Sequence, residues 1–418
     1  MAVKQTPFWQ GLFTLFSILS FFSGAFADET APGPKPGTAD SSKSAIPRLV
    51  GMLIMFRRLP CRGSDNSTSD KQHLIWLRQK INLPGFEFGA QTNGQYTAGT
   101  NPAMPPPESQ IAHFLSQNVN FFRVPVAWEY LQPEMNGKLN EVNLKAYQTF
   151  IEKITTHGAY VAIDLHAFAR YKGQIVGESP STPASALVSL WTQLGAVFKD
   201  NPLVMFGISN EPHDLVITTW ATTVQKVVTA LREKKIENIL LIPGTEYTAM
   251  KSFPEWYKAM KVVKNPDGSF DRLVMEVHRY LDTDNSGKSR DCTASHADEV
   301  AKAVELLKAD GRQVILGETG GGSTDTCMKF LPELAAAVTD AYPVFLGFAM
   351  WAAGSFDANY ELVTTVKDES SPTGWKDQGN WNSIKKFIPA KGSEKAAKSP
   401  SSKPKTKKKA ACKRRAMI

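Results

Sequence analysis

Short apolar runs recur between residues 81 and 388, and stretches with a helical repeat of apolar positions separate them. Short apolar runs bounded by Pro or Gly are typical of strands buried on both faces of a parallel sheet. Eight such runs are predicted as strands: Leu83–Phe88, Asn120–Val124, Tyr160–Asp164, Val204–Ile208, Ile239–Ile242, Leu273–Val277, Val314–Gly317 and Phe345–Met350.

The intervening stretches predict helices. In the stretch after residue 140, Leu144, Tyr147 and Ile151 fall on one helical face. The predicted helices are Ser109–Ser116, Glu141–His157, Ala184–Lys199, Leu215–Lys235, Glu255–Val262, Ala297–Ala309 and Lys329–Thr339. Eight strands alternating with helices predict an α/β fold, a (β/α)8 or TIM barrel that forms one domain over residues 81–390. A doubly wound open sheet is the alternative, but no Gly-rich phosphate-binding sequence follows the first predicted strand.

The N-terminal segment has the features of a secretory signal peptide over residues 1–27. Lys4 precedes an apolar stretch, Phe8–Phe26, and Ala25-Phe26-Ala27 fits a cleavage site of small residues. An N-terminal membrane anchor is the alternative, because the stretch is nearly long enough to span a bilayer. Residues 28–48 are rich in Pro and Ser and predict a flexible linker. The mature protein is therefore expected to be secreted and extracellular and not to be bound to a membrane.

Residues 49–80 fit neither the strand pattern nor the helix pattern. The part from Met52 to Lys80 separates Arg48–Gly51 (RLVG) from Ile81–Gly89 (INLPGFEFG), and these two pieces would join into one natural first strand. Our hypothesis is that residues 52–80 are an insertion or a retained intron translated in frame, which sequencing of the transcript would test. Asn66 begins the chain's one glycosylation sequon.

The net charge of +8 is concentrated at the C-terminus. Residues 391–418 hold eleven Lys or Arg and one Glu, a net of +10, which leaves −2 for residues 1–390. This basic tail is predicted to be disordered. It has two interpretations: binding of nucleic acid or an anionic wall polymer, or a solvated tail without a specific partner. We favour the second and expect no nucleic-acid partner, because a secreted protein meets no nucleus.

Two glutamates stand just beyond apolar runs. Glu211 follows Val204–Ser209, and Glu318 follows Val314–Gly317. In a parallel barrel, reactive side chains at the C-terminal ends of strands point into the mouth of the active site. A glycosidase needs two carboxyl groups there, one as proton donor and one as nucleophile or base. The pair therefore predicts glycoside hydrolysis.

Polar and aromatic side chains at other strand ends support this prediction. Arg123 is placed to keep a nucleophilic carboxylate ionised. His166 and His278 are suited to bonding sugar hydroxyls or the catalytic carboxylates, and Tyr280 to donating to the nucleophile. Trp351 offers a flat apolar face for a sugar ring. A lone His or Trp is usually a core residue, but these lie where barrels collect their function.

Seven ordered stretches between residues 82 and 388 resemble glycoside hydrolase family 5, in its fungal endo-β-1,4-glucanase (cellulase) branch. They are Gly85–Gly89 (GFEFG), Phe122–Trp128 (FRVPVAW), Ile163–Tyr171 (IDLHAFARY), Ser209–Asp214 (SNEPHD), His278–Asp282 (HRYLD), Gly317–Gly322 (GETGGG) and Trp351–Asp357 (WAAGSFD). The Asn-Glu-Pro motif alone is moderately specific, whereas the ordered set is highly specific.

The resemblance implies a retaining mechanism with Glu211 as acid/base and Glu318 as nucleophile. It implies supporting or substrate-binding positions at Arg123, His166, Asn210, His278, Tyr280 and Trp351. Retention predicts carboxyl groups about 5–5.5 Å apart. The family needs no metal or organic cofactor, and the chain has no Cys/His spacing typical of zinc sites.

The resemblance also pairs Cys292 with Cys327 in a disulfide, but gives no counterpart for Cys61 or Cys412. Three departures from the branch stand out. Ala167 replaces a usual Asn, Ala90 follows Gly89 where Cys is frequent, and Arg279 stands where Gln is common.

The expected function is therefore a secreted, monomeric endo-β-1,4-glucanase acting on cellulose or mixed-linkage β-glucan. One alternative is a relative that acts on mannan, xyloglucan or β-1,3-glucan with the same fold and catalytic pair. Another is a polysaccharide-binding wall protein with weak or no catalysis, which the intact pair of glutamates disfavours.

Overall fold

The computed structural model describes residues 80–97 and 103–388. The predicted signal peptide, the linker, the segment 49–79, the sequon at Asn66, Cys61, Cys412 and the basic tail lie outside the described residues. Within that part, no helix has the length and apolar character needed to cross a membrane.

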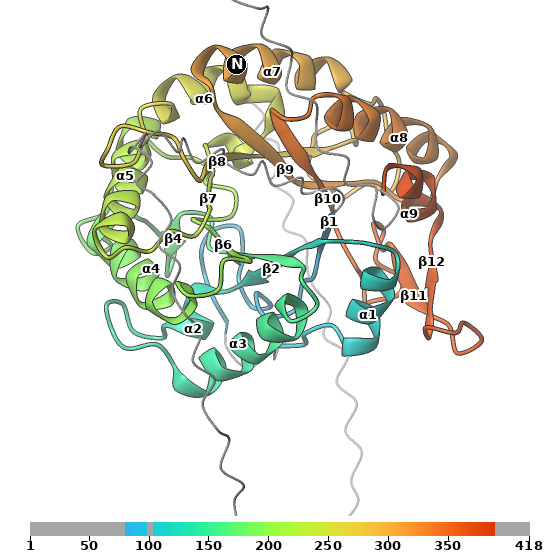
Figure 1. Cartoon of the computed structure of the whole chain (residues 1–418), viewed down its shortest axis with the longest axis horizontal. Helices are drawn as coiled ribbons and strands as arrows, with labels where there is room; N and C mark the ends of the chain where they lie inside the picture. The colour runs from blue at the N-terminus through green and yellow to red at the C-terminus, as the bar shows by residue number, and fades with distance from the viewer. Residues whose placement is uncertain (1–79, 98–102, 389–418) are drawn as a thin grey trace, which may run out of the picture. The chain divides into compact units, whose positions relative to one another are not determined.

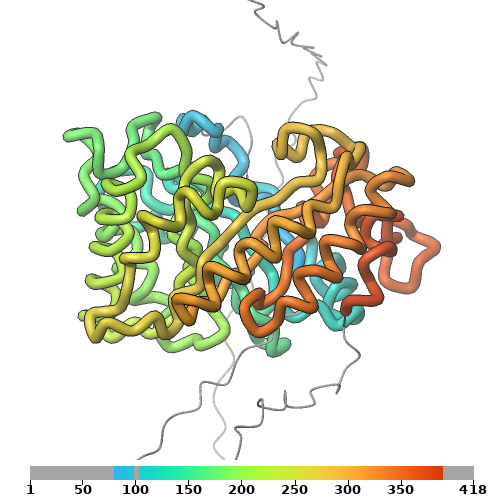
Figure 2. Tube along the Cα trace, turned by 90° about the horizontal axis from the view of Figure 1, so that it is seen from above, coloured from blue at the N-terminus to red at the C-terminus, as the bar shows by residue number. Residues whose placement is uncertain are grey.

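Eight parallel strands close into a barrel in the order β1-β10-β9-β8-β7-β6-β3-β2, which confirms the predicted TIM barrel (Figure 1). Because β1 pairs with both β2 and β10, the chain closes the barrel in a single circuit. Figure 2 shows the green middle part of the chain on one side and the orange to red C-terminal part on the other. The barrel strands are β1 (Lys80–Asn82), β2 (Phe121–Val126), β3 (Tyr160–Leu165), β6 (Val204–Gly207), β7 (Leu240–Ile242), β8 (Leu273–Tyr280), β9 (Gln313–Gly320) and β10 (Phe345–Met350).

Helices surround the barrel, and all seven predicted helices are present with ends shifted by a few residues. Asn140 caps the helix Glu141–Thr155 by accepting a hydrogen bond from the backbone N–H of Asn143. Thr324 caps the helix Asp325–Asp340 by accepting one from the backbone N–H of Cys327. The helices are α1 (Glu108–Ser116), α3 (Glu141–Thr155), α4 (Ala184–Phe198), α5 (Ile217–Glu233), α6 (Phe253–Met260), α7 (Ala297–Asp310) and α8 (Asp325–Asp340).

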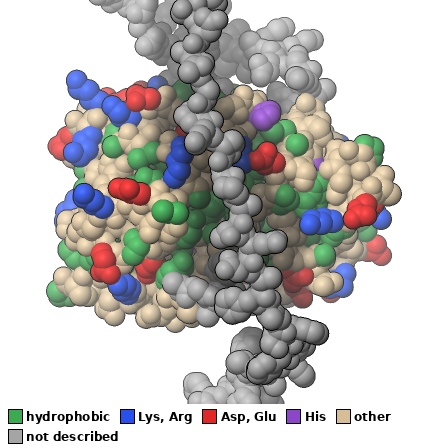
Figure 3. Space-filling view, turned by 90° about the horizontal axis from the view of Figure 1, so that it is seen from below, with side chains coloured by type: hydrophobic (Ala, Val, Ile, Leu, Met, Phe, Trp, Pro, Cys, Tyr) green, Lys and Arg blue, Asp and Glu red, His purple; other side chains and the backbone are tan. Residues whose placement is uncertain are grey.

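Several short elements were not predicted. They are α2 (Trp128–Leu131), α9 (Gly379–Ile384), the 3-10 turns Glu246–Thr248, Met250–Ser252 and Lys385–Phe387, and two small antiparallel sheets, β4 (Arg170–Tyr171) with β5 (Gln174–Ile175) and β11 (Thr365–Lys367) with β12 (Trp375–Asp377). On the side drawn in Figure 3, acidic and basic side chains are interspersed over the described surface.

The first predicted strand, Leu83–Phe88, is wrong. The barrel strand is β1, Lys80–Asn82, and only Phe86 from the predicted run makes an isolated bridge, to Val126. Leu83 still donates its N–H to the Arg123 carbonyl at 2.8 Å, but Pro84 has no N–H to donate and Gly85 has a φ of 157°, so the ladder ends there. Lys80, assigned by sequence to the atypical segment 49–80, therefore belongs to the barrel.

The floor of the barrel is a layer of apolar side chains. Seven barrel strands each contribute one: Phe121, Ala162, Met205, Leu241, Val274, Ile315 and Leu346. The remaining strand, β1, contributes Lys80, which pairs in register with Phe121 and is fully buried. Its Nζ lies 4.8 Å from the centre of the Phe121 ring. The floor is thus apolar except for one amine.

Candidate active site

Glu211 and Glu318 meet at the C-terminal end of the barrel. Glu318 lies within β9, while Glu211 stands four residues beyond β6, with a left-handed backbone φ of 40°. His278 in β8 lies between them, with Nδ1 2.8 Å from Glu211 Oε1 and 3.8 Å from Glu318 Oε2. Ligand atoms of the three side chains all lie within 4.8 Å of one another. The two carboxyl groups are therefore a close pair.

Arg123 is the centre of the charge network behind this pair. Its guanidinium is buried and donates to Glu318 at 2.6 Å, to Glu276 at 3.0 Å and to Asn210 at 2.7 Å. Asp164 Oδ1 forms an ion pair with the guanidinium, 3.0 Å from Nη2. Burial alone lowers the pKa of Arg123, but the surrounding carboxylates outweigh burial and raise it. Arg123 is therefore a permanent cation that orients three carboxylates and two amides, those of Asn210 and Asn82.

Glu318 is held in its ionised form. Its Oε1 accepts from Arg123, and its Oε2 accepts from the Tyr280 hydroxyl at 2.6 Å. Burial raises the pKa of this carboxyl, but the charges of His278 and Arg123 and the Tyr280 hydrogen bond outweigh burial and lower it. Burial and the neighbouring Glu318 raise the pKa of Tyr280 well above its usual range, so its hydroxyl remains a donor.

Glu211 has a different environment. Its side chain is 17% exposed, against 4% for Glu318, so it faces the open side of the site. Its contact is the His278 Nδ1–H, which donates to Oε1. Burial lowers the pKa of His278, but Glu318, Glu211 and Glu276 outweigh burial and raise it to about 10. A protonated His278 therefore balances charge between the two glutamates.

The remaining predicted residues line the same mouth. Asn210 Nδ2 lies 3.3 Å from His166 Nε2, and His166 Nδ1 lies 2.8 Å from Asp164 Oδ2. The His166 ring stacks on Trp351, with centroids 5.7 Å apart and planes 21° apart. All six predicted supporting residues thus come together around the glutamates.

Sequence reasoning assigned no role to several residues that complete the site. Asp164, Glu276 and Asn82 hold Arg123, and the only sequence signal was a polar residue within an apolar strand. Glu87 is buried near His166, and burial raises its pKa to about 7. Tyr247 stacks on His213 at 4.2 Å and is 42% exposed, but no sequence pattern marked it.

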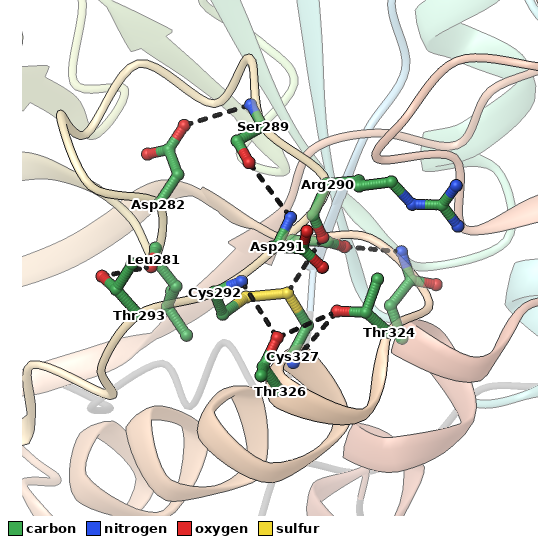
Figure 4. Close-up of a disulfide and its surroundings, with 12 residues drawn as sticks. Leu281, Asp282, Ser289, Arg290, Asp291, Cys292, Thr293, Thr324, Thr326 and Cys327 are labelled. Carbon is green, nitrogen blue, oxygen red and sulfur yellow. Dashed lines mark hydrogen bonds between the residues drawn. A yellow bond between two sulfur atoms is a disulfide. The ribbon is translucent and has the colours of Figure 1, made fainter.

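The disulfide expected from the resemblance is present between Cys292 and Cys327, with Cα atoms 4.8 Å apart (Figure 4). It joins the loop after β8 to the first turn of α8. The backbone between Glu318 and α8 packs against it, since a Cβ on Gly321 would lie inside contact distance of both sulfurs. The bridge therefore braces the chain that follows Glu318.

Two groups in the site have ligand atoms close enough for a metal ion: Asp164, His166 and Glu318, and Glu211, His278 and Glu318. In both groups the Glu318 carboxylate already pairs with the Arg123 guanidinium, which in the first group pairs with Asp164 as well, so a divalent cation would compete with a buried cation. The Arg123 charge would oppose a cation at both places.

Comparisons with known proteins agree with this geometry. The family model "Cellulase (glycosyl hydrolase family 5)" matches residues 79–354. The "Manganese dependent endoglucanase Eg5A" of Phanerodontia chrysosporium is 39% identical over 315 residues, which cover 74% of this chain and 79% of that protein.

Solved structures give the same result. The crystal structure of Cel5A (EG2) from Hypocrea jecorina has a TM-score of 0.69 at 34% identity, covering 74% of this chain and 98% of that one. XacCel5A in complex with cellopentaose has a TM-score of 0.67 at 29% identity, covering 75% of this chain and 100% of that one. The protein is thus a cellulase-type glycoside hydrolase, and the chain belongs to glycosyl hydrolase family 5.

Proposed function

We propose that the protein is a retaining endo-β-1,4-glucanase that cleaves internal bonds of cellulose or mixed-linkage β-glucan. The observation that carries the proposal is the unequal environment of two adjacent glutamates. Glu318 is buried and kept ionised by Arg123 and Tyr280, whereas Glu211 is partly exposed beside it. A retaining glycosidase needs this combination of a fixed nucleophile and an accessible acid/base at short separation.

In the first step, a carboxylate oxygen of Glu318 attacks the anomeric carbon while Glu211 gives its proton to the departing glycosidic oxygen. The bond from the anomeric carbon to that oxygen breaks, and a glycosyl ester of Glu318 forms. In the second step, Glu211 removes a proton from water, and the water oxygen displaces Glu318 from the anomeric carbon. The sugar leaves with its original anomeric configuration.

The other side chains bind the substrate. Asn210, fixed by Arg123 on its carbonyl oxygen, presents its NH₂ group toward the 2-hydroxyl of the sugar at the cleavage point. Trp351, stacked on His166, forms a platform for a ring on the non-reducing side. The cellopentaose bound by XacCel5A supports a cello-oligosaccharide as the ligand class.

Substrate choice is tested by product analysis on carboxymethylcellulose, barley β-glucan and mannan side by side, with Glu318→Gln as the inactive control. We expect loss of viscosity on the first two and β-configured first products by NMR. Preferred cleavage of mannan would support a relative with another specificity, and xyloglucan and β-1,3-glucan are added to the panel to test the other two specificities. Polysaccharide binding without wild-type cleavage would support a wall-binding protein instead.

We also propose that the protein is secreted. The support for secretion is the leader pattern of residues 1–27 together with a disulfide, which persists in oxidising compartments. N-terminal sequencing of protein from the culture medium should begin at Asp28. Retention of the protein in the membrane fraction with residues 1–27 attached would support the anchor instead.

A further inference from the structure

Arg279 is a buried cation that the catalytic network does not use. It alternates with His278 and Tyr280 along β8, so its side chain lies on the opposite face of the strand from theirs. Its guanidinium bonds Glu299 in the first turn of α7 at 2.9 Å and His296 Nδ1 at 2.7 Å. A second arm donates to the amide oxygen of Asn285 at 2.8 Å. Arg279 therefore joins α7 to the loop that follows β8.

That loop packs directly against Tyr280. Asn285, with a φ of 65°, accepts from the Tyr280 backbone N–H at 2.8 Å through the same oxygen that Arg279 holds. Two residues on, a Cβ on Gly287 would lie 2.7 Å from the edge of the Tyr280 ring. Asp282 fixes the far side of the loop by accepting from Ser286 and from the backbone N–H groups of residues 288 and 289. The loop thus backs the ring whose hydroxyl reaches Glu318.

We propose that Arg279 is a positioning residue, which fixes the loop through Asn285 and so keeps the Tyr280 hydroxyl on Glu318. The inference rests on Glu318 as the nucleophile, as proposed above. Guanidinium is suited to this role because its rigid fork donates in several directions at once. Lys, a single point donor, and Gln, which is common at this position in the branch, cannot span Asn285 and Glu299 together.

The readout is the acid limb of the pH profile of kcat/KM, which follows ionisation of the nucleophile in the free enzyme. The groups that face Glu318 are Arg123, His166, Glu211, Glu276, His278, Tyr280 and Tyr360. Of these, Tyr280 is the one whose backbone N–H bonds Asn285 and whose ring packs against Gly287, so its contact with Glu318 is the one that depends on the loop. The Tyr280 hydrogen bond lowers the pKa of Glu318, so loss of this bond raises that pKa and moves the acid limb to higher pH.

The experiment is a double-mutant cycle in the full chain with Arg279→Gln, Tyr280→Phe and the combined variant. We expect Arg279→Gln to lower kcat/KM on the order of tenfold, as for loss of a hydrogen bond to a charged group, and to move the acid limb upward. In the Tyr280→Phe background, Arg279→Gln should have no further effect on either quantity. Asn285→Gly, which tolerates the positive φ, removes the other partner of the Arg279–Asn285 hydrogen bond. It should therefore change kcat/KM and the acid limb as Arg279→Gln does.

A merely structural Arg279 would lower the melting temperature without moving the acid limb, or its effect would multiply with that of Tyr280→Phe, and either result would overturn the proposal. If Arg279→Gln does not fold, the same decision is made with Asn285→Gly. Trapping of the wild type with a 2-fluoro cellobioside distinguishes failure of the nucleophile assignment from failure of the inference about Arg279. A label on another residue overturns both the nucleophile assignment and this inference, whereas a label on Glu318 with an unmoved acid limb overturns the inference alone.

Discussion

The two ends of the barrel interior differ in whether their buried basic side chain has partners. At the C-terminal end, Arg123 is surrounded by Asp164, Glu276 and Glu318, all at hydrogen-bonding distance. At the floor, the Lys80 amine has no hydrogen-bond partner among the described residues and stands in a layer of apolar side chains. Burial lowers the pKa of Lys80 well below its usual range, and the charge of Glu276 opposes this only in part.

This difference teaches that burial alone does not mark a functional ion. A buried charge stabilises a site when several partners satisfy it, and costs free energy when none does. At the active-site end the charges hold the nucleophile in place, whereas the floor is an apolar layer that contains one amine without a hydrogen-bond partner among the described residues. The comparison therefore predicts opposite signs for substitutions at the two ends.

The largest effect is expected at the nucleophile itself. Glu318→Gln keeps the shape of the side chain but removes its charge, and should lower kcat on soluble cellulose by roughly 10⁴-fold or more. The exposed Glu369→Gln is the matched control and should keep full activity. Activity of Glu318→Gln within about tenfold of the wild type would disprove its role, since a nucleophile contributes far more than that.

Removal of Arg123 should cost stability as well as activity. Arg123→Met leaves Asp164, Glu276 and Glu318 buried without their shared cation, which should lower the free energy of unfolding by about 3–5 kcal/mol. Urea unfolding measures this change, with exposed Arg290→Met as the control. An Arg123→Met protein as stable as the wild type would show that the carboxylates do not depend on this cation.

The distribution of charged residues along the strands also explains which strands could be predicted from the sequence. Seven of the eight predicted strands match barrel strands, because their apolar runs are buried on both faces. The first strand was misplaced because Lys80, a charged residue, opens β1, while Leu83 and Phe86 beyond it look more like a strand. β2 and β8 were found although Arg123 and Glu276 point inward, because apolar neighbours keep each run recognisable, whereas β1 has a single apolar residue between Lys80 and Asn82.

The predicted site came together because a barrel brings the C-terminal ends of all its strands to one rim. Residues that are far apart in the sequence but lie in barrel strands, such as Arg123 and Glu318, therefore meet although no sequence signal links one to the other. Tyr247 could not be found, because its exposure depends on a left-handed loop with a φ of 59°. Pairing of Glu276 with Arg123 likewise depends on barrel closure, which sequence periodicity does not describe.

Lys80→Met should stabilise the protein. Met has a similar volume and no polar atom, so it removes an unsatisfied buried amine at a gain of about 1–3 kcal/mol near neutral pH. Because the folded pKa of Lys80 is lowered, the unfolded chain binds the extra proton, and wild-type stability rises with pH toward the unfolded lysine value. The advantage of Lys80→Met should therefore shrink as pH approaches about 10. Exposed Lys226→Met is the control, and an equal or lower melting temperature for Lys80→Met would contradict the prediction.

The smallest effect is expected from deleting residues 52–80, the segment that we interpret as an insertion or retained intron. Gly51 then directly precedes Ile81 and takes the position of Lys80 beside Phe121, so a residue without a side chain replaces the unpaired amine. Relief of the amine is worth about 1–3 kcal/mol, but Gly in a strand costs about 0.5–1 kcal/mol and the emptied space of the buried Lys80 stem costs more, so a net change close to zero is expected. Differential scanning calorimetry and the soluble-cellulose assay, run on both chains, measure this change and test whether activity is retained. A shortened chain that unfolds far below the full-length chain or loses activity would show that residues 52–80 belong to the working enzyme.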